Sequence, residues 1–273
     1  MSQPAHNLLD DTFAKLKAAG KTALIPFVTV GDPDPETTLD ILAVLEEAGA
    51  DVVELGVPYS DPLADGPVIQ RASERALVHG ITVASCIRTA AKARERGIRL
   101  PFVLFTYYNP VLQMGSERFF AELKDAGISG LIIPDLPYEE AEEVLGMADA
   151  AGVKLIPLVA PTSSGRIARI LERARGFVYC VSSLGVTGER ASFHASVDEF
   201  IASVKAQTDL PVAVGFGISS REQVERFAAI CDGAVVGSAI VRKIEESLPL
   251  LAQTSTRDQG LLQFRDFVAK LRL

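Results

Sequence analysis

The sequence predicts an α/β fold, a closed (β/α)8 barrel of the TIM type, and three observations lead to this prediction. Short runs rich in Val, Ile and Leu alternate along the chain with longer segments of helical periodicity. The runs are continuously apolar, as expected for parallel strands that are covered on both faces. Eight β-α units fit into about 250 residues, which is typical of this barrel. An open, doubly wound sheet is the alternative, because it is also built from β-α repeats.

The predicted strands begin at residue 23 and are separated by helices. The first of these helices starts at the N-cap Asp34 with Pro35 in its first turn, and its apolar stripe ends before Gly49. The same pattern predicts helices over Val83–Arg96, Glu117–Ala126, Glu139–Ala151 and Ser219–Ala229. The predicted strands are Ala23–Val30, Asp51–Leu55, Phe102–Thr106, Gly130–Ile133, Lys154–Leu158, Phe177–Val181, Val212–Val214 and Gly233–Val236.

Two further helices are predicted outside the repeat. One precedes the first strand and carries an apolar stripe of Leu8, Leu9, Phe13 and Leu16. The other covers Leu261–Leu273, after a polar segment at 253–259. We therefore expect residues 1–273 to form a single TIM-barrel domain with an extra N-terminal helix and a C-terminal helix.

The composition excludes several classes of protein. The chain has 27 Lys and Arg against 35 Asp and Glu, a formal net charge of −8 and a pI near 5.0. This balance leaves no basic surface to dominate binding to a phosphate backbone, so no nucleic-acid partner is expected. No apolar run approaches the roughly 18–20 residues of a membrane span, and Asp10 and Asp11 lie where a signal peptide needs an apolar stretch. We expect a cytoplasmic protein that does not bind membranes.

The cysteines and histidines do not predict a metal site. Cys86, Cys180 and Cys231 are odd in number, far apart and flanked by apolar residues, which is typical of reduced thiols in a core. The three histidines form no ligand pair either. We therefore expect no bound metal.

Three acidic residues lie in and after the second predicted strand, at the end of the barrel that carries the active site in this fold. Glu54 lies between Val53 and Leu55, where an ionised carboxylate is costly unless it is paired or its pKa rises. A raised pKa would suit proton transfer, whereas a salt bridge to a neighbouring strand explains the position equally well. Asp61 and Asp65 follow in a long loop stiffened by proline, where each is either catalytic or a turn former that bonds its own backbone.

Glycines cluster after the sixth, seventh and eighth predicted strands. Glycines let backbone N–H groups approach a ligand, and a helix N-terminus adds partial positive charge, so such loops can hold a phosphate. Tight turns alone would explain any one of these loops, but three successive ones favour phosphate binding. The segments are Gly185-Val186-Thr187-Gly188, Gly215-Phe216-Gly217-Ile218-Ser219 and Gly237-Ser238-Ala239.

Apolar and aromatic side chains near the same rim could enclose a flat aromatic group, although such residues are more often plain core. Two polar side chains, Asp135 and Tyr179, are predicted beside them. The apolar and aromatic candidates are Phe27, Phe105, Tyr107, Ile132 and Phe216.

The whole chain resembles the tryptophan synthase alpha chain family, from the first predicted helix to the last. The longest motif that carries the resemblance runs from Glu54 to Pro67 and reads ELGVPYSDPLADGP. The other matching motifs are Tyr107-Tyr108-Asn109-Pro110, Ile133-Pro134-Asp135-Leu136-Pro137, Gly185-Val186-Thr187-Gly188 and Gly215-Phe216-Gly217-Ile218. One departure is Ser183-Leu184, where some relatives carry an arginine.

The resemblance implies an enzyme of tryptophan biosynthesis, a lyase that cleaves indole-3-glycerol phosphate to indole and glyceraldehyde 3-phosphate by a retro-aldol reaction. Carried over residue by residue, it implies that Glu54 is the general acid and base and that Asp65 is the carboxylate at the indole nitrogen. Thr187 matches the threonine of the family's lid. Gly188, Gly217, Gly237 and Ser238 match the family's phosphate site.

The resemblance also implies a partner, a tryptophan synthase beta chain in an α2β2 heterotetramer. That chain would carry pyridoxal phosphate and receive the indole, and no cofactor is expected on the present chain. Asp61-Pro62 and Asn109-Pro110 would face the partner.

Other functions compete with this interpretation. A phosphosugar isomerase would share the phosphate loops but would not require the two carboxylates at their spacing or the apolar wall. A catalytically silent subunit gated by a phosphate ligand would not need to retain both carboxylates. A stand-alone lyase that releases indole without a partner is a third alternative.

Overall fold

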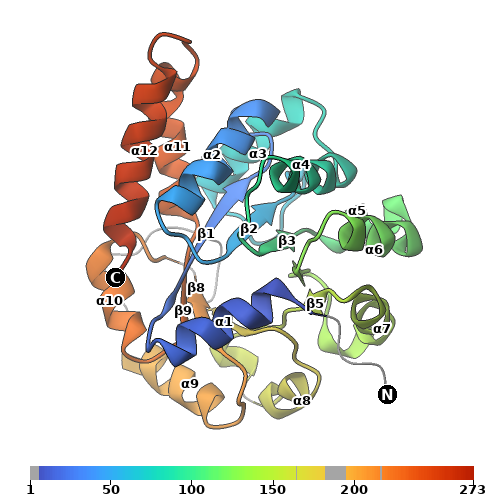
Figure 1. The fold of residues 1–273 in the computed structure, drawn as a ribbon. Helices are drawn as coiled ribbons and strands as arrows, with labels where there is room; N and C mark the ends of the chain where they lie inside the picture. The colour runs from blue at the N-terminus through green and yellow to red at the C-terminus, as the bar shows by residue number, and fades with distance from the viewer. Residues whose placement is uncertain (1–5, 164, 182–194, 216) are drawn as a thin grey trace.

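The computed structural model describes residues 6–163, 165–181, 195–215 and 217–273. Within these residues, parallel strands form one sheet in the order β5-β4-β3-β2-β1-β9-β8-β7-β6, with helices around its outside (Figure 1). This arrangement confirms the predicted barrel and excludes the open sheet. The strands are β1 Ala23–Thr29, β2 Val53–Gly56, β3 Phe102–Phe105, β4 Gly130–Ile132, β5 Lys154–Leu155, β6 Leu158–Val159, β7 Val178–Val181, β8 Val212–Gly215 and β9 Gly233–Val236.

The segment 154–159 closes the barrel. Its N-terminal part pairs with β4, and the Ile156 N–H donates to the Leu131 carbonyl at 2.9 Å. Its C-terminal part pairs with β7, and the Pro157 carbonyl accepts from the Tyr179 N–H at 3.0 Å. The single strand predicted over 154–158 is therefore divided into β5 and β6, because Pro157 has no N–H to continue the ladder.

The predicted helices are present in the predicted order, together with others for which no bounds were predicted, and several of them begin at a different residue. The helix predicted from Ser219 begins at Arg221, because Ser220 is its N-cap. A 3₁₀ turn, η1, precedes α7 because the Glu140 N–H bonds to the Pro137 carbonyl at 3.0 Å, three residues back. The terminal helix begins at Arg257, within the polar segment, because the Arg257 guanidinium is fixed by Asp40 at 2.7 Å. The helices are α1 Leu8–Ala18, α2 Pro35–Glu47, α3 Pro67–Val78, α4 Val83–Glu95, α5 Tyr108–Met114, α6 Ser116–Asp125, η1 Tyr138–Glu140, α7 Glu142–Ala151, η2 Pro161–Ser163, α8 Ile167–Glu172, α9 Ala195–Lys205, α10 Arg221–Ala228, α11 Ser238–Leu251 and α12 Arg257–Leu271.

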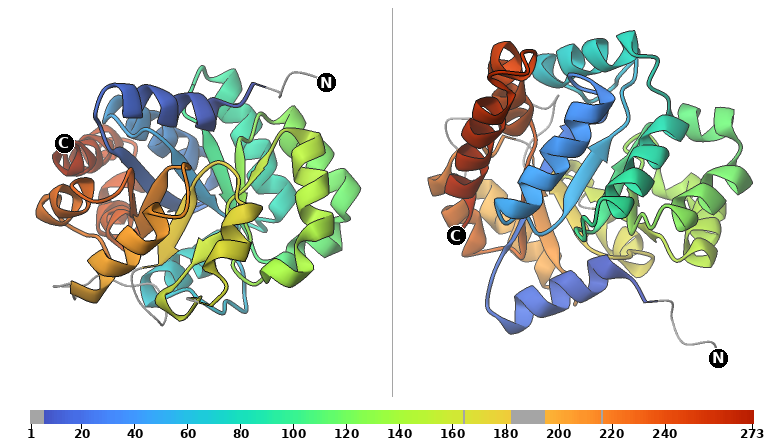
Figure 2. Two further views of the ribbon diagram at one scale, coloured as in Figure 1. Left: turned by 90° about the horizontal axis from the view of Figure 1, so that it is seen from below. Right: turned by 45° about the horizontal axis from the view of Figure 1, so that its top comes forward.

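The sheet separates two layers of buried side chains. The outer layer lies between the strands and the surrounding helices and forms the larger core. The inner layer fills the barrel, and the extra N-terminal helix contributes to it through Leu9, Phe13 and Leu16. The Phe13 and Phe177 rings lie 5.4 Å apart, and α1 crosses the lower end of the barrel (Figure 2). Because α1 packs over this end, a ligand that enters the barrel has to approach from the opposite end.

The three cysteines are buried free thiols, as predicted. In the described part of the chain, no helix is long and apolar enough to cross a membrane.

Candidate active site

A cavity opens at the C-terminal ends of the strands, where the sequence predicted the active site. It brings together both predicted carboxylates and residues from strands β1, β2, β3, β7 and β9. Its lining consists of Phe27, Glu54, Asp65, Ile69, Phe105, Tyr179, Gly217, Val235, Gly237 and Ser238.

Glu54 lies on β2 in an apolar setting. The register places it between Phe27 of β1 and Val103 of β3, and its exposed fraction is 1%. Among the described residues, its Oε1 has no hydrogen-bond partner. Burial raises the pKa of Glu54 from its ordinary value of 4.5 to about 8. Within the described part of the chain the salt-bridge interpretation of this residue is thus not supported, and the raised pKa favours the protonated carboxyl group at neutral pH.

Gly56, the first glycine of the motif from Glu54 to Pro67, lies where a side chain would not fit. A Cβ on Gly56 would lie 2.2 Å from the Phe27 Cζ. The Phe27 ring therefore passes directly over the β2 backbone, and it meets Phe105 edge-on at 5.8 Å. This contact fixes an aromatic wall beside Glu54.

Asp65 lies in the loop between β2 and α3 and is 9% exposed. Burial raises its pKa from 3.8 to about 6, and a hydrogen bond from Tyr107 acts in the opposite direction. The same Tyr107 hydroxyl accepts from the Leu63 N–H at 3.2 Å and from the Ala64 N–H at 3.1 Å. One hydroxyl group therefore both holds the loop and favours the ionised form of Asp65.

The far side of the cavity can receive an anion. Gly237 is the N-cap of α11, and among the described residues no side chain caps the first N–H groups of this 14-residue helix, which begins at Ser238. Gly217 has φ +108°, a conformation that favours glycine. Together they form a site suited to a phosphate group.

An ion-pair network joins the two helices that begin at the cavity. Arg71 of α3 holds Glu245 of α11 with two bonds of 2.8 and 2.7 Å. Arg75 bonds to Glu245 at 2.9 Å and to the buried Asp32 at 2.7 and 3.0 Å. The network ties the end of the Asp65 loop to the helix that starts at Ser238.

Other predicted residues lie elsewhere. Ile132 belongs to the packed interior of the barrel, and Tyr107 supports the Asp65 loop instead of lining the cavity. Asp135 accepts from the Tyr108 N–H at 2.9 Å and so caps α5. Three predicted residues, Thr187, Gly188 and Phe216, lie outside the described residues, as does Ser183-Leu184.

Two lining residues were missed by sequence reasoning. Val235 lies on β9 two residues before Gly237, so the alternation of strand side chains could have placed it inside the barrel. Ile69 lies in the first turn of α3, shortly after Asp65. The apolar stripe of that helix is the sequence signal that could have placed Ile69 on the face toward the barrel.

The predicted partner segments lie beside the cavity and are partly exposed. Asp61 accepts from the Ser60 hydroxyl at 2.5 Å, and Asn109 donates to the Tyr59 hydroxyl at 3.3 Å. Two large apolar side chains stand exposed next to them, Leu63 at 75% and Leu112 at 55%. Within the described residues, no group of His, Cys, Asp and Glu is arranged to hold a metal ion.

The sequence model of the tryptophan synthase alpha chain family matches residues 13–269. The chain belongs to this family. Curated alpha chains agree with the assignment. The alpha chain of Bacillus pumilus (strain SAFR-032) is 53% identical over 248 residues, covering 91% of this chain and 93% of its own. The alpha chain of Bacillus subtilis (strain 168) is 54% identical over 243 residues, which cover 89% of this chain and 91% of the relative.

Solved structures of the same family share the fold. Mycobacterium tuberculosis tryptophan synthase in space group F222 has a chain with a TM-score of 0.86 and 38% identity, covering 97% of this chain and 98% of its own. The alpha chain from Legionella pneumophila subsp. pneumophila has a TM-score of 0.86 and 35% identity, and the match covers 98% of this chain and 97% of that chain. The predicted enzyme is thereby confirmed: a tryptophan synthase alpha chain is a lyase that cleaves indole-3-glycerol phosphate.

Proposed function

We propose that Glu54 and Asp65 carry out the cleavage in this chain. Protonated Glu54 donates its proton to C3 of the indole ring, and the indole nitrogen then bears positive charge. The resulting Glu54 carboxylate takes the proton of the adjacent glycerol hydroxyl, and the bond between C3 and the glycerol carbon breaks. Its electron pair returns to the ring and restores neutral indole, while the glycerol fragment leaves as an aldehyde. Glu54 ends the cycle protonated, so atoms and charges balance.

The observation that carries this proposal is the buried Oε1 of Glu54, which has no hydrogen-bond partner among the described residues. A carboxyl group with a pKa of about 8 is protonated at neutral pH, as the first step requires, and it is basic enough after ionisation for the second. Asp65, with a pKa of about 6, is mainly ionised at the same pH. It can therefore stabilise the positive charge on the indole nitrogen.

We assign the phosphate to the N-terminus of α11, with Gly217, Gly237 and Ser238 as its described contacts and Gly188 as a further one. The indole ring would lie against Phe27, Phe105 and Tyr179, with Ile132, Tyr107, Asp135, Thr187 and Phe216 as the remaining substrate-side residues. The cavity encloses about 40 Å³.

We further propose that the indole passes to a beta chain that carries pyridoxal phosphate, in an α2β2 heterotetramer, and that this chain needs no cofactor of its own. The surface around Asp61-Pro62 and Asn109-Pro110 is the proposed contact. Its support is the pair of exposed apolar side chains, Leu63 and Leu112, which a partner would cover. The chain would work in the cytoplasm as a single barrel domain over residues 1–273.

Indole release from indole-3-glycerol phosphate tests this proposal. The purified chain is assayed alone and with a tryptophan synthase beta chain, beside Glu54→Gln and the surface control Glu117→Gln. We expect release that the beta chain accelerates, that Glu54→Gln abolishes and that Glu117→Gln leaves unchanged. Release that the beta chain does not change would indicate a stand-alone lyase. If Glu54→Gln released indole at the wild-type rate, the role of Glu54 would be refuted.

A further inference from the structure

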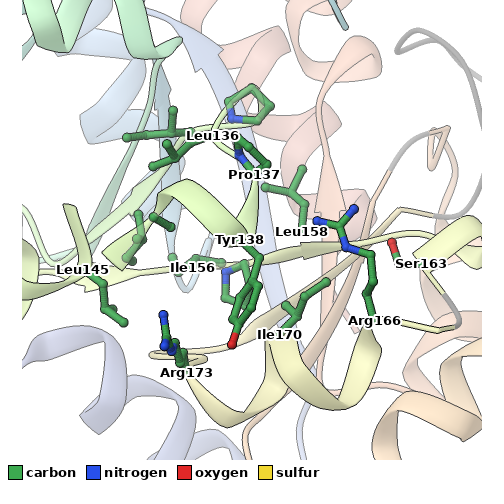
Figure 3. Close-up of a pocket in the computed structure, with 15 residues that line it drawn as sticks. Leu136, Pro137, Tyr138, Leu145, Ile156, Leu158, Ser163, Arg166, Ile170 and Arg173 are labelled. Atoms are coloured by element: carbon green, nitrogen blue, oxygen red, sulfur yellow. The ribbon is translucent and has the colours of Figure 1, made fainter. Parts of the chain in front are cut away.

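A second cavity lies outside the barrel wall, between the helices that follow β4 and β6 (Figure 3). Its floor is the end of these strands, at Ile133-Pro134 and 155–158, and its sides are η1 with α7 and α8. It encloses about 230 Å³, and none of its described lining residues also lines the catalytic cavity. We name it the α7–α8 cavity.

The walls of the α7–α8 cavity are apolar and partly aromatic. In Figure 3 the Tyr138 side chain lies near the middle of the lining residues, with Leu145 on one side of it and Leu158 and Ile170 on the other. The side chains of Leu145 and Tyr138 are only partly buried, so they present apolar surface to the space between the helices, whereas Leu158 packs against the inner layer of the barrel. Such walls suit a flat ring system.

The charged residues that line the cavity are all of one sign. Arg166 and Arg173 of the α8 segment take part in the lining, and no Asp or Glu among the described residues does. Figure 3 shows their side chains on either side of Tyr138. Each of these arginines also has a glutamate partner at the rim, Glu139 for Arg166 and Glu142 for Arg173. An anionic ligand would therefore need a guanidinium group that its glutamate leaves accessible.

Arg173 retains donors for such a ligand. Its nearest carboxylate oxygen is the Glu142 Oε2 at 3.7 Å, on a side chain that is 84% exposed. Its guanidinium carbon lies 5.2 Å from the centre of the Tyr138 ring. A guanidinium group has five N–H donors, and a solvent-exposed pair of this length occupies few of them. Arg166 differs, because it is paired closely with Glu139 at the rim.

We propose that the α7–α8 cavity is a second ligand site, which takes a small aromatic molecule with one negative charge. The ring would lie against Tyr138 and Ile170, and the anionic group would bind the Arg173 guanidinium. The site is separate from the catalytic residues, so it stands or falls independently of their proposed roles.

Two fluorescent probes with the same ring system test the charge requirement. 1-Anilinonaphthalene-8-sulfonate carries one negative charge, and N-phenyl-1-naphthylamine is its neutral counterpart. Both are titrated into the full chain, which has no tryptophan to interfere with their emission. We expect Arg173→Met to raise the Kd of the sulfonate at least about tenfold and to leave the Kd of the neutral probe within about twofold.

The control variant is Arg118→Met, because Arg118 is also exposed and paired with one glutamate but lies on α6, away from the lining. It should change neither Kd. A second variant, Ile170→Phe, narrows the cavity without introducing a tryptophan and should weaken both probes, which keeps the test valid if Arg173→Met folds poorly. Circular dichroism and the Tm of each variant verify the fold.

Two results would overturn the proposal. One is displacement of the sulfonate by glycerol 3-phosphate, which would place the probe at the catalytic phosphate site. The other is an equal response of the sulfonate to Arg173→Met and Arg118→Met, which would mean that it binds by general charge attraction.

Discussion

The two carboxylates of the catalytic cavity are held by different kinds of structure. Glu54 is part of a strand, with a paired strand on each side, and its position follows from the sheet register. Asp65 is part of a loop, and its position depends on the hydroxyl of Tyr107 and on the ion pairs that anchor α3. The pKa of Glu54 is raised by burial alone, whereas that of Asp65 is a balance between burial and one hydrogen bond. Substitution of the side chains that hold the loop should therefore change the pKa of Asp65 and leave the pKa of Glu54 unchanged.

The largest effect is expected for Glu54→Gln. The amide cannot transfer the proton that both steps need, so kcat should fall about 10³-fold. Binding of glycerol 3-phosphate, measured by calorimetry, should stay within about twofold of wild type. A comparable loss of phosphate binding would mean that Glu54 holds the site together and does not act in proton transfer.

Asp65→Asn should have the next largest effect. Loss of the negative charge removes stabilisation of the positive indole nitrogen, so kcat should fall about 10²-fold. The matched control is Asp125→Asn, because Asp125 is exposed at the end of α6. Equal rates for the two variants would remove Asp65 from the mechanism.

The rate of the wild-type chain should depend on pH on both sides of neutrality. Asp65 has to be ionised, so kcat/KM should fall below about pH 6. Glu54 has to be protonated at the start, so kcat/KM should fall above about pH 8. A profile that stays flat up to pH 9 would contradict the assignment of Glu54 as the acid.

Tyr107→Phe should affect the loop carboxylate only. The lost hydrogen bond no longer favours the ionised form, so the pKa of Asp65 should rise above about 6 and the acid limb of the profile should move to higher pH. We expect about a tenfold loss of kcat, while the basic limb stays in place. Tyr108→Phe is the matched control. Movement of both limbs would show that the two carboxylates are not independently held.

The last prediction concerns stability instead of rate. Between pH 4.5 and about 8, the folded chain keeps the Glu54 proton that the unfolded chain has lost. The free energy of unfolding should therefore fall as pH rises through this window. Glu54→Gln should lack this contribution and be more stable than wild type at pH 8. Urea unfolding at pH 6 and pH 8 measures the difference, and parallel changes in both proteins would contradict it.

Sequence patterns identified Glu54 because a charged residue inside an apolar strand is conspicuous in a single chain. They could not decide between a salt bridge and a raised pKa, since that depends on which side chains the neighbouring strands bring close. The role of Tyr107 was not visible either, because its hydroxyl meets a loop about 40 residues earlier in the chain. The same limit applies to Pro157, whose position at the closure of the barrel depends on pairing with β4 and β7.

The sequence by itself determined the repeat of strands and helices, the end of the barrel that carries the site, and the residue types available for acid, charge and phosphate chemistry. These features follow from local periodicity, glycine conformation and the cost of burying charge. The tertiary structure alone decided how the two carboxylates differ and where the arginines of α8 meet Tyr138. Desolvation and hydrogen bonding are sums over neighbours from distant segments, and those neighbours exist only once the chain has folded.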